Sequence, residues 1–378
     1  MLLIRGNPSL VTTSFAVMEA EKAAERDWSS LAPELLNLIA KHLSEISDFI
    51  RFRAVCTPWR LSTPITDLPP QFPWILEKRG YYFEPHMHFY STTSSKMYAF
   101  HDPKYLRQRV FGSSQGYMLS EFCDPTTIRA FTSPYTVHTY QISLFNPLNN
   151  HKITLPACDL GLYSYSYWIG PQQYQIGEYV VRGGYFNHRG YQLAFCRLGQ
   201  DNWFKFNSEN YCDGCPDFGF FHIKSMLFRV DDDTGVTYVF DLTTGNLAYV
   251  LPQVEDPIGN YYIVDASGHI LIVFQCFGVS DDSHDFWFHV YQLDFSGGSS
   301  PHWVKVNNIG NQALFIDLDG GIALEASDFA GINANCIYYI EQSWVKRIDI
   351  ETGDQELLQC PFEEPERWFV PNLGHLQS

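Results

Sequence analysis

Two cysteines three positions apart are the clearest candidates for metal or redox chemistry in this sequence. Cys212 and Cys215 form its one C-x-x-C motif. A structural zinc site needs four ligands, usually with a second pair at a defined spacing, and only His222 lies nearby. A redox motif would open a helix in a βαβ unit, whereas this motif lies between Tyr211 and Pro216 in a loop-like run. We therefore interpret both cysteines as free thiols in a loop.

Three other short motifs resemble parts of known sites. His86 and His88 alternate along a predicted strand, where two imidazoles could share a metal ion, but we interpret them as ordinary strand residues. The acidic run 231–235 lacks the alternating ligands and the distant glutamate of an EF-hand, so it indicates a solvated turn. Residues 217–219 read Asp-Phe-Gly without the other kinase motifs. We expect no catalytic residue, metal ion or cofactor, although carboxylates paired across the fold remain an alternative for which nothing selects a pair.

Composition narrows the class of protein further. Of the 378 residues, 45% are hydrophobic and 16% aromatic, which suffices for a sizeable core. The 42 acidic residues outnumber 25 Lys and Arg, for a net charge of −17, so nucleic acid is a poor partner. Nine cysteines are an odd number in a long chain, which favours reduced thiols and a cytoplasmic or nuclear location. The sequence has no uninterrupted run of 18 apolar residues, so we expect no membrane partner.

The elements that position these residues fall into four predicted parts. We predict a disordered segment or extension over 1–26, helices over 27–62, a Pro-rich linker over 63–74 and a β-propeller over 75–378. Residues 1–17 contain one arginine and no acid, so a targeting peptide is an alternative, although Pro8 interrupts the apolar run.

Residues 27–62 carry a helical pattern. Apolar residues recur at i, i+1, i+4 and i+8 at Leu35, Leu36, Ile39 and Leu43. Pro33 suits the first position of a helix, and Ser47 or Asp48 can cap a second one. About forty residues do not usually form a stable core alone, and apolar residues point to more than one face. One face must therefore be buried on the β-domain or in an apolar groove of another protein, and the Pro-rich linker favours the second.

The remainder of the chain predicts many short strands. Apolar and aromatic runs alternate with Gly, Asn, Asp and Pro clusters. A repeated frame places Asn or Asp after an apolar residue and a turn residue four positions later. Its clear and weaker copies fall at His101, Asn146, Ala194, Asp241, Asp294 and Asp349. A period near fifty residues with several strands per unit predicts a propeller of six four-stranded blades, in which the Asp side chains serve the hairpin turns.

Part of the helical region resembles an F-box. The pattern Leu-Pro-x-x-Leu, then Ile and Leu, and finally Arg-x-Val-Cys-x-x-Trp is matched over thirty residues, and Arg53 is among the matches. We expect the adaptor-binding residues to be Leu31, Pro33, Leu35, Leu36, Ile39, Leu43, Phe49, Phe52, Val55, Cys56 and Trp59. Ala32 stands where proline is frequent, and Pro58 is expected to kink or end the last helix beside Trp59. We also expect Cys56 to be a small buried apolar residue.

The rest of the chain resembles the plant KIB-type β-propeller family, which is attached to F-boxes. The segments "SSQGYMLSEF", "ISLFNPLNNHKITLP", "NQALFIDLDGGIALEASDFAGINANCIYYI" and "WFVPNL" carry this resemblance. The two resemblances together span residues 28–373. They predict a small all-α F-box followed by an all-β, six-bladed propeller.

This resemblance implies a substrate-recognition subunit of a Skp–cullin–F-box ubiquitin ligase. The F-box would dock on a Skp-type adaptor and, through it, on a cullin–RING ligase, while the propeller binds an unknown protein substrate. Such a subunit is not an enzyme and contributes proximity alone. The alternatives are a propeller that binds carbohydrate or acts as an enzyme, and a scaffold outside any ligase whose helices pack back on the propeller.

Overall fold

The computed structural model divides the chain into two compact units, 1–69 and 70–378. The residues it describes are 27–77, 86–101, 108–114, 116–122, 141–156, 163–169, 179–185, 191–205, 220–223, 226–231, 234–241, 243–254, 259–278, 286–296, 300–317, 320–341 and 343–374. The predicted extension over 1–26 therefore lies outside the described residues, as do the Cys212–Cys215 pair and the segment 217–219.

The first unit is helical and contains short elements. Its described elements are η1 (Trp28–Ser30), α2 (Pro33–Ala40), α3 (Ile46–Arg53), α4 (Thr57–Ser62) and η2 (Ile65–Asp67). Pro33 begins α2, and Glu34 places a negative charge at the positive end of the helix dipole. The second long helix begins at Ile46, earlier than the cap predicted at Ser47 or Asp48.

Pro58 does not have the effect that the sequence predicted. It neither kinks nor ends a helix, because α3 has already ended at Arg53 and α4 begins at Thr57. Pro58 therefore lies in the first turn of a new helix, where a missing N–H removes no intrahelical hydrogen bond. Thr63, which is fully buried, closes this helix by donating its hydroxyl to the carbonyl of Trp59.

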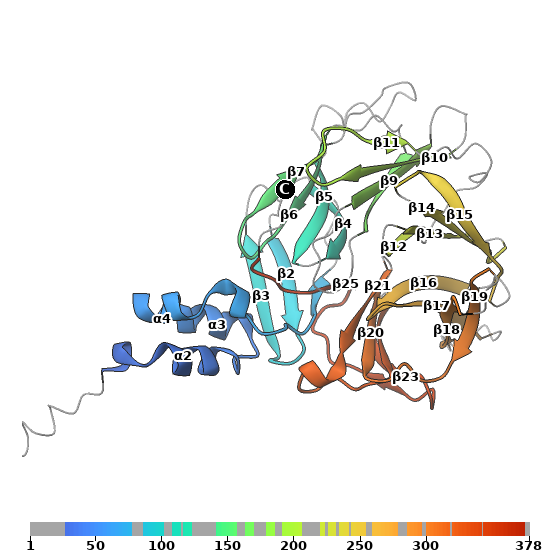
Figure 1. Cartoon of the computed structure of the whole chain (residues 1–378). Coiled ribbons are helices and arrows are strands. Elements are labelled where there is room, and N and C mark those ends of the chain that lie inside the picture. The colour runs from blue at the N-terminus through green and yellow to red at the C-terminus, as the bar shows by residue number, and fades with distance from the viewer. Residues whose placement is uncertain are drawn as a thin grey trace, which may run out of the picture. The chain divides into compact units, whose positions relative to one another are not determined.

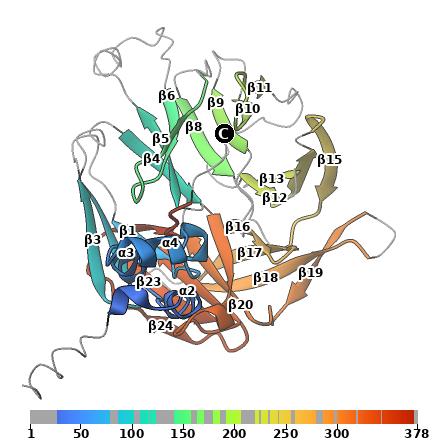
Figure 2. The same cartoon turned by 60° about the vertical axis from the view of Figure 1, so that its left-hand side comes forward.

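The second unit consists of β-sheets set around a common centre (Figure 1; Figure 2). In chain order we number them as sheets 1 to 6. The strand order is β25 (Pro365–Phe369), β1 (Trp74–Glu77), β2 (His86–Ser91), β3 (Lys96–His101) in sheet 1; β4 (Gln108–Ser114), β5 (Tyr117–Phe122), β6 (Gln141–Phe145), β7 (Lys152–Thr154) in sheet 2; β11 (Phe204–Lys205), β10 (Tyr191–Arg197), β9 (Tyr179–Tyr185), β8 (Tyr163–Ile169) in sheet 3.

The other three sheets follow along the chain. Their strand order is β12 (Phe220–Ile223), β13 (Met226–Val230), β14 (Thr237–Asp241), β15 (Asn246–Leu251) in sheet 4; β16 (Gly259–Ala266), β17 (His269–Phe277), β18 (Phe286–Asp294), β19 (His302–Val306) in sheet 5; β21 (Gly320–Glu325), β20 (Gln312–Asp317), β22 (Cys336–Glu341), β23 (Trp344–Asp349), β24 (Gln355–Leu357) in sheet 6. A short 3₁₀ turn, η5 (Ala326–Asp328), follows β21.

The prediction of a six-bladed propeller with four strands in each blade is wrong. Five sheets have the four-stranded antiparallel arrangement of a propeller blade, so the propeller has five regular blades. Sheet 6 differs because it has five strands and because β20 pairs in parallel with β22. The chain after β21 passes through η5 and returns before β22, which makes β22 run in the direction of β20. The Asp-turn frame marked only Asp349 in this region, so the extra strand was not visible in the repeat.

The ring closes through strands from both ends of the second unit. The C-terminal strand β25 pairs antiparallel with β1, with Trp74 opposite Phe369 and Ile75 opposite Trp368. This pairing joins residues nearly 300 positions apart, so the closing sheet depends on contacts of high sequence separation. Trp74 and Phe369 are both almost fully buried. Deleting either strand is therefore expected to open the ring.

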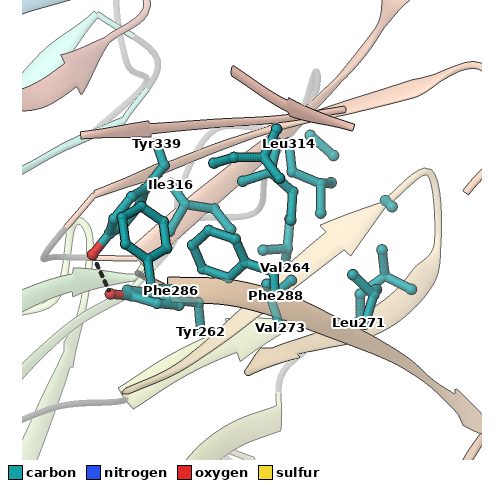
Figure 3. Packing of buried hydrophobic residues seen from close by; sticks show 14 residues of the cluster. Tyr262, Val264, Leu271, Val273, Phe286, Phe288, Leu314, Ile316 and Tyr339 are labelled. Carbon is teal, nitrogen blue, oxygen red and sulfur yellow. Dashed lines mark hydrogen bonds between the residues drawn. The ribbon is translucent and has the colours of Figure 1, made fainter. Parts of the chain in front are cut away.

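Apolar side chains fill the seams between neighbouring sheets. The seam between sheets 5 and 6 contains Val264, Phe286, Phe288 and Leu314, and it is shown in Figure 3. Burying one such side chain contributes about 1.5–3 kcal/mol to the stability of the fold, relative to leaving it in water. At one end of the seam the hydroxyls of Tyr262 and Tyr339 lie 3.3 Å apart. Burial raises the pKa of the Tyr262 hydroxyl to about 12 and also raises the pKa of Tyr339, so both hydroxyls stay protonated well above physiological pH.

The repeated Asp residues serve hairpin turns, as the sequence predicted. Asp241 accepts hydrogen bonds from the backbone N–H and the hydroxyl of Thr243 at 2.7 and 2.6 Å. Asp349 accepts from the N–H groups of Glu351 and Thr352. These bonds favour the carboxylate and lower the pKa of both Asp side chains. The turn ends at Gly245 or Gly353 with positive φ, which glycine adopts without a steric penalty.

Candidate docking surface of the helical unit

The apolar residues of the helical unit divide into a buried set and an exposed set. Leu36 and Ala40, one turn apart on α2, are fully buried, and so is Phe49 on α3. Residues four positions apart lie on the same face of a helix, so Leu36 and Ala40 define the inward face of α2. Ile46 joins them with an exposed fraction of 2%. Two of the predicted adaptor-binding residues, Leu36 and Phe49, therefore belong to the core of the chain.

Trp59 also packs inside the helical unit. Its ring lies 4.5 Å from that of Phe52, measured between centroids. Its indole N–H donates to the carbonyl of Trp28 at 2.9 Å. Both the aromatic ring and the N–H of Trp59 therefore have partners within the helical unit, as the indole of a half-buried tryptophan usually does. The start of α4 at Thr57 sets this orientation, which joins α4 to α3 and to η1.

The opposite face of α2 is apolar and exposed to solvent. Leu35, Leu38 and Ile39 lie at i, i+3 and i+4, and their exposed fractions are 50, 56 and 41%. Three exposed branched apolar side chains on two helical turns form a contiguous patch, which is uncommon on a surface that contacts only water. We call these three residues the α2 patch.

Further exposed apolar residues lie on the other two helices. Val55 follows α3 and is 60% exposed, Ile50 lies on α3 and Leu61 on α4. Sequence analysis singled out Leu35, Ile39 and Val55 but missed Leu38, Ile50 and Leu61. Leu38 could have been found from its spacing, because it lies three positions after Leu35 and therefore on the same side of the helix, away from Leu36 and Ala40.

The remaining predicted residues have intermediate positions. Leu31, Leu43 and Cys56 are half-buried, and Pro33 is exposed. Cys56 lies just before α4 with extended backbone, and it is half-buried where the sequence analysis expected a small buried apolar residue. The function of all eleven residues in adaptor binding stays a prediction.

Polar contacts hold the surface of the helical unit in place. The side chain of Asn37 on α2 donates to the carboxylate of Asp67 on η2. Asn37 lies between Leu36 and Leu38, so this contact ties the turn after α4 to the helix that carries the α2 patch. Arg51 and Asp48 form an exposed ion pair at 2.8 Å on α3, whose contribution to stability is small because solvent screens it.

The other candidate chemistry has no assembled site among the described residues. His88 contacts the carboxylate of Glu77 at 2.7 Å, and the Nδ1 atoms of His86 and His101 lie 3.2 Å apart. Within the described ranges no group of three or more His, Cys, Asp or Glu side chains is arranged to hold a metal ion. Asp231 accepts hydrogen bonds from Thr234, as in an ordinary turn.

Two further observations concern thiols and membranes. The cysteines that the structure describes, which are Cys56, Cys196, Cys276, Cys336 and Cys360, are all free. Among the described residues, no helix has the length and apolar character needed to cross a membrane.

Comparison with known proteins identifies the second unit. A family model described as "KIB1-4 beta-propeller" matches residues 89–363. The chain belongs to this family. The KIB1-4 match spans β2 to the segment before β25, and thus most of the second unit. The resemblance to a plant F-box protein with a KIB-type propeller is therefore confirmed.

Curated relatives of this KIB1-4 propeller chain have F-box names. The chain is 24% identical to "F-box/kelch-repeat protein At1g64840" of Arabidopsis thaliana over 87% of its own length and 89% of that protein. It is 21% identical to "Probable F-box protein At4g22060" of the same plant over 92% of itself and 97% of the relative. The similarity to these proteins includes both units.

Solved structures resemble the chain more distantly. TolB from Acinetobacter baumannii has a TM-score of 0.46 and 9% identity, and the similarity covers 79% of this chain and 66% of TolB. A TM-score below 0.5 supports no inference about function.

Proposed function

We propose that the chain is the substrate-recognition subunit of a Skp–cullin–F-box ubiquitin ligase. The observation that carries this proposal is the α2 patch, in which Leu35, Leu38 and Ile39 are exposed on a helical unit that precedes a KIB1-4 propeller. The F-box names of the curated relatives support it. In this proposal the helical unit docks on a Skp-type adaptor and the propeller binds a protein substrate.

The burial of each apolar residue decides whether we propose that it supports the helices or contacts the adaptor. Leu36 and Phe49 have no exposed surface, so they would act by supporting the helices and not by touching the adaptor. Leu35, Leu38, Ile39 and Val55 have surface available for an apolar groove. Interfaces of this kind concentrate their binding energy in a few apolar anchors at the centre. The proposed docking surface therefore consists of the α2 patch together with Val55.

In this proposal the chain acts by bringing a substrate close to an enzyme, and it makes or breaks no covalent bond itself. The propeller would hold a protein substrate near a ubiquitin-conjugating enzyme that the cullin–RING assembly brings, which raises the effective concentration of substrate lysines. We propose that the chain itself is no enzyme and that it works in the cytoplasm, the nucleus or both. A carbohydrate-binding or enzymatic propeller and a scaffold outside the ligase remain alternatives without a specific observation in their favour.

A co-purification experiment tests the docking surface directly. The full chain, the double variant Leu35→Asp/Ile39→Asp and the control Leu357→Asp are each captured with a purified Skp-type adaptor and a cullin. We expect the double variant to bind on the order of 100-fold more weakly, because two apolar contacts are lost and charges replace them. Leu357 is 59% exposed on β24 of the propeller, so its replacement is expected to leave binding unchanged.

Two outcomes would contradict the proposal. Unchanged adaptor binding by the double variant would show that the α2 patch is not the docking surface. Failure of the unmodified full chain to bind the adaptor and cullin would favour the scaffold alternative. Leu36→Asp is unsuitable as a test, because a charge at a fully buried position unfolds the helices and removes binding for an unrelated reason.

A further inference from the structure

The chain continues beyond the closing strand and crosses to the neighbouring sheet. After β25 ends at Phe369 in sheet 1, residues 370–374 run toward β6 and β7 of sheet 2 (Figure 1). We call residues 370–374 the C-terminal strap. Leu373, near its end, is 7% exposed. The strap is therefore packed against the protein along a course that ring closure through β25 does not require.

Side chains of sheet 2 donate hydrogen bonds to the strap backbone. Asn146 donates from Nδ2 to the carbonyl of Asn372 at 2.8 Å. Asn149, three residues later in the β6–β7 turn, donates to the carbonyls of Leu373 at 3.1 Å and Gly374 at 3.2 Å. None of these carbonyls pairs in a described β-ladder, so the two asparagines satisfy backbone acceptors of the strap, and the hydroxyl of Tyr117 also donates to Gly374 at 3.5 Å.

Asn146 differs from the aspartates of the repeated frame because its amide can both accept and donate a hydrogen bond. Its Oδ1 accepts the N–H of Leu148 at 2.9 Å, just as the carboxylate of Asp294 accepts the N–H of Ser296 at 2.8 Å. An aspartate can accept the N–H of the turn but cannot also donate to the strap, because a carboxylate has no donor. The amide of Asn146 serves the turn and the strap at once, which explains asparagine at this copy of the repeat.

A glycine in sheet 2 permits the close approach of the strap. Gly116 has φ +81° at the β4–β5 turn, and a Cβ there would lie 2.7 Å from Cβ of Asn372 and 2.8 Å from its carbonyl oxygen. Contacts this short do not occur between real side chains, so any other residue must displace the strap. Gly245 has a similar φ of +71° but no atom within 4 Å of such a Cβ. The two glycines thus share a backbone requirement, and Gly116 alone of the pair contacts the strap.

The strand before the strap is also tied to sheet 2. Ser113 on β4 donates its hydroxyl to the carbonyl of Trp368 at 2.5 Å. Arg367, which is buried, donates to the carbonyl of Val110 at 3.4 Å. The hydrogen bonds between sheets 1 and 2 therefore begin on β25, at Arg367 and Trp368, and occur again in the strap from Asn372 to Gly374.

We propose that the C-terminal strap is a second closure of the propeller, which fastens sheet 1 to sheet 2 after β25 has closed sheet 1. Its release would loosen the seam between these sheets while leaving every β-ladder intact. The seam would then be the place where the ring opens first. This proposal does not depend on ligase function.

Truncation tests whether the strap holds the seam. The full chain is compared with chains ending at Gly374 and at Phe369, by thermal unfolding and by amide hydrogen exchange. Residues 375–378 are outside the strap, so ending at Gly374 is expected to change nothing. Ending at Phe369 is expected to lower Tm by roughly 5 °C and to speed exchange in β4–β6 more than in β16–β18. Equal Tm and equal exchange in the two truncated chains would overturn the proposal.

The glycine pair provides a test that does not require truncation. Gly116→Ala and Gly245→Ala both place Ala at positive φ, so they share the backbone penalty. In the full chain we expect Gly116→Ala to lower Tm by roughly twice as much as Gly245→Ala or more. In the chain ending at Phe369 the two penalties should become equal, because Asn372 is absent. Equal penalties in the full chain would overturn the proposal, even if the truncated chain fails to fold.

Discussion

At the scale of single residues, one buried carboxyl group links sheet 6 to the closing strand. Asp317 at the end of β20 accepts the backbone N–H of Trp368 at 2.7 Å. Burial disfavours its charged form, and this effect exceeds the attraction of Arg367, so the pKa of Asp317 is raised to about 6. Asp241 and Asp349, which sit in exposed turns, have lowered pKa values. Residues of one type thus respond in opposite directions because their surroundings differ.

The raised pKa of Asp317 predicts a pH dependence of stability. The folded value lies above the ordinary 3.8, so the native state binds the proton more tightly than the unfolded chain. Its contribution is therefore most favourable below pH 3.8 and is lost as pH rises to about 6, by on the order of 3 kcal/mol. Asp317→Asn has nearly the same shape and cannot titrate. Urea unfolding at pH 4.5 and 6.5 should show that the wild type loses stability relative to this variant over that interval; parallel pH profiles would contradict the assignment.

At the scale of elements, α2 shows how two faces of one short helix separate support from docking. Leu36 and Ala40 are buried, while Leu38 on the other side is 56% exposed. The apolar character of both faces is visible in the sequence, and so is the start of the helix at Pro33. Which face is buried could not be predicted, because Leu35 and Leu36 are the same residue type and only tertiary packing distinguishes them.

This separation of faces makes a testable prediction about two leucines. Leu36→Ala removes a fully buried side chain and is expected to destabilise the helical unit by about 2–5 kcal/mol. Leu38→Ala should change stability by less than about 0.5 kcal/mol, because its side chain is mostly in water. Helical circular dichroism during urea unfolding of the full chain measures both. Similar losses in the two variants would show that the faces are not distinct.

The strands illustrate what a repeat in the sequence can and cannot predict. The Asp-turn frame located a hairpin in four sheets, because Asn or Asp together with Gly suits a tight turn that binds its own backbone. These hairpins follow Asn146, Asp241, Asp294 and Asp349, whereas Ala194 lies inside β10 and His101 ends the outer strand β3. Asp241 and Asp349 behave in this way. The hairpin of β20 and β21 also has an aspartate, Asp317, four positions before a glycine, Gly321, but the period near fifty residues placed no copy of the frame there. Counting turns therefore predicted six four-stranded blades where the propeller has five, and it missed the fifth strand of sheet 6 and the parallel pair that this strand brings.

At the scale of the whole molecule, the second unit contains all the strands that close its ring. β1 begins at Trp74, after the division between Pro69 and Pro70, and pairs with β25. The apolar cluster that includes Phe72, Ile75 and Trp368 joins sheet 1 to sheet 6 and draws every described member from the second unit. The cores and ladders described for this unit therefore need no residue of the helical unit.

This independence predicts the result of two nested deletions. Removing residues 1–69 leaves β1 and Phe72 in place, so the propeller should unfold at a Tm within about 2 °C of its transition in the full chain. Removing residues 1–77 also deletes β1, which leaves β25 without its ladder partner and exposes Phe369. We expect that shorter chain to aggregate or to unfold at a much lower temperature. Equal behaviour of the two deletions, measured by calorimetry and size-exclusion chromatography, would mean that β1 does not close the ring.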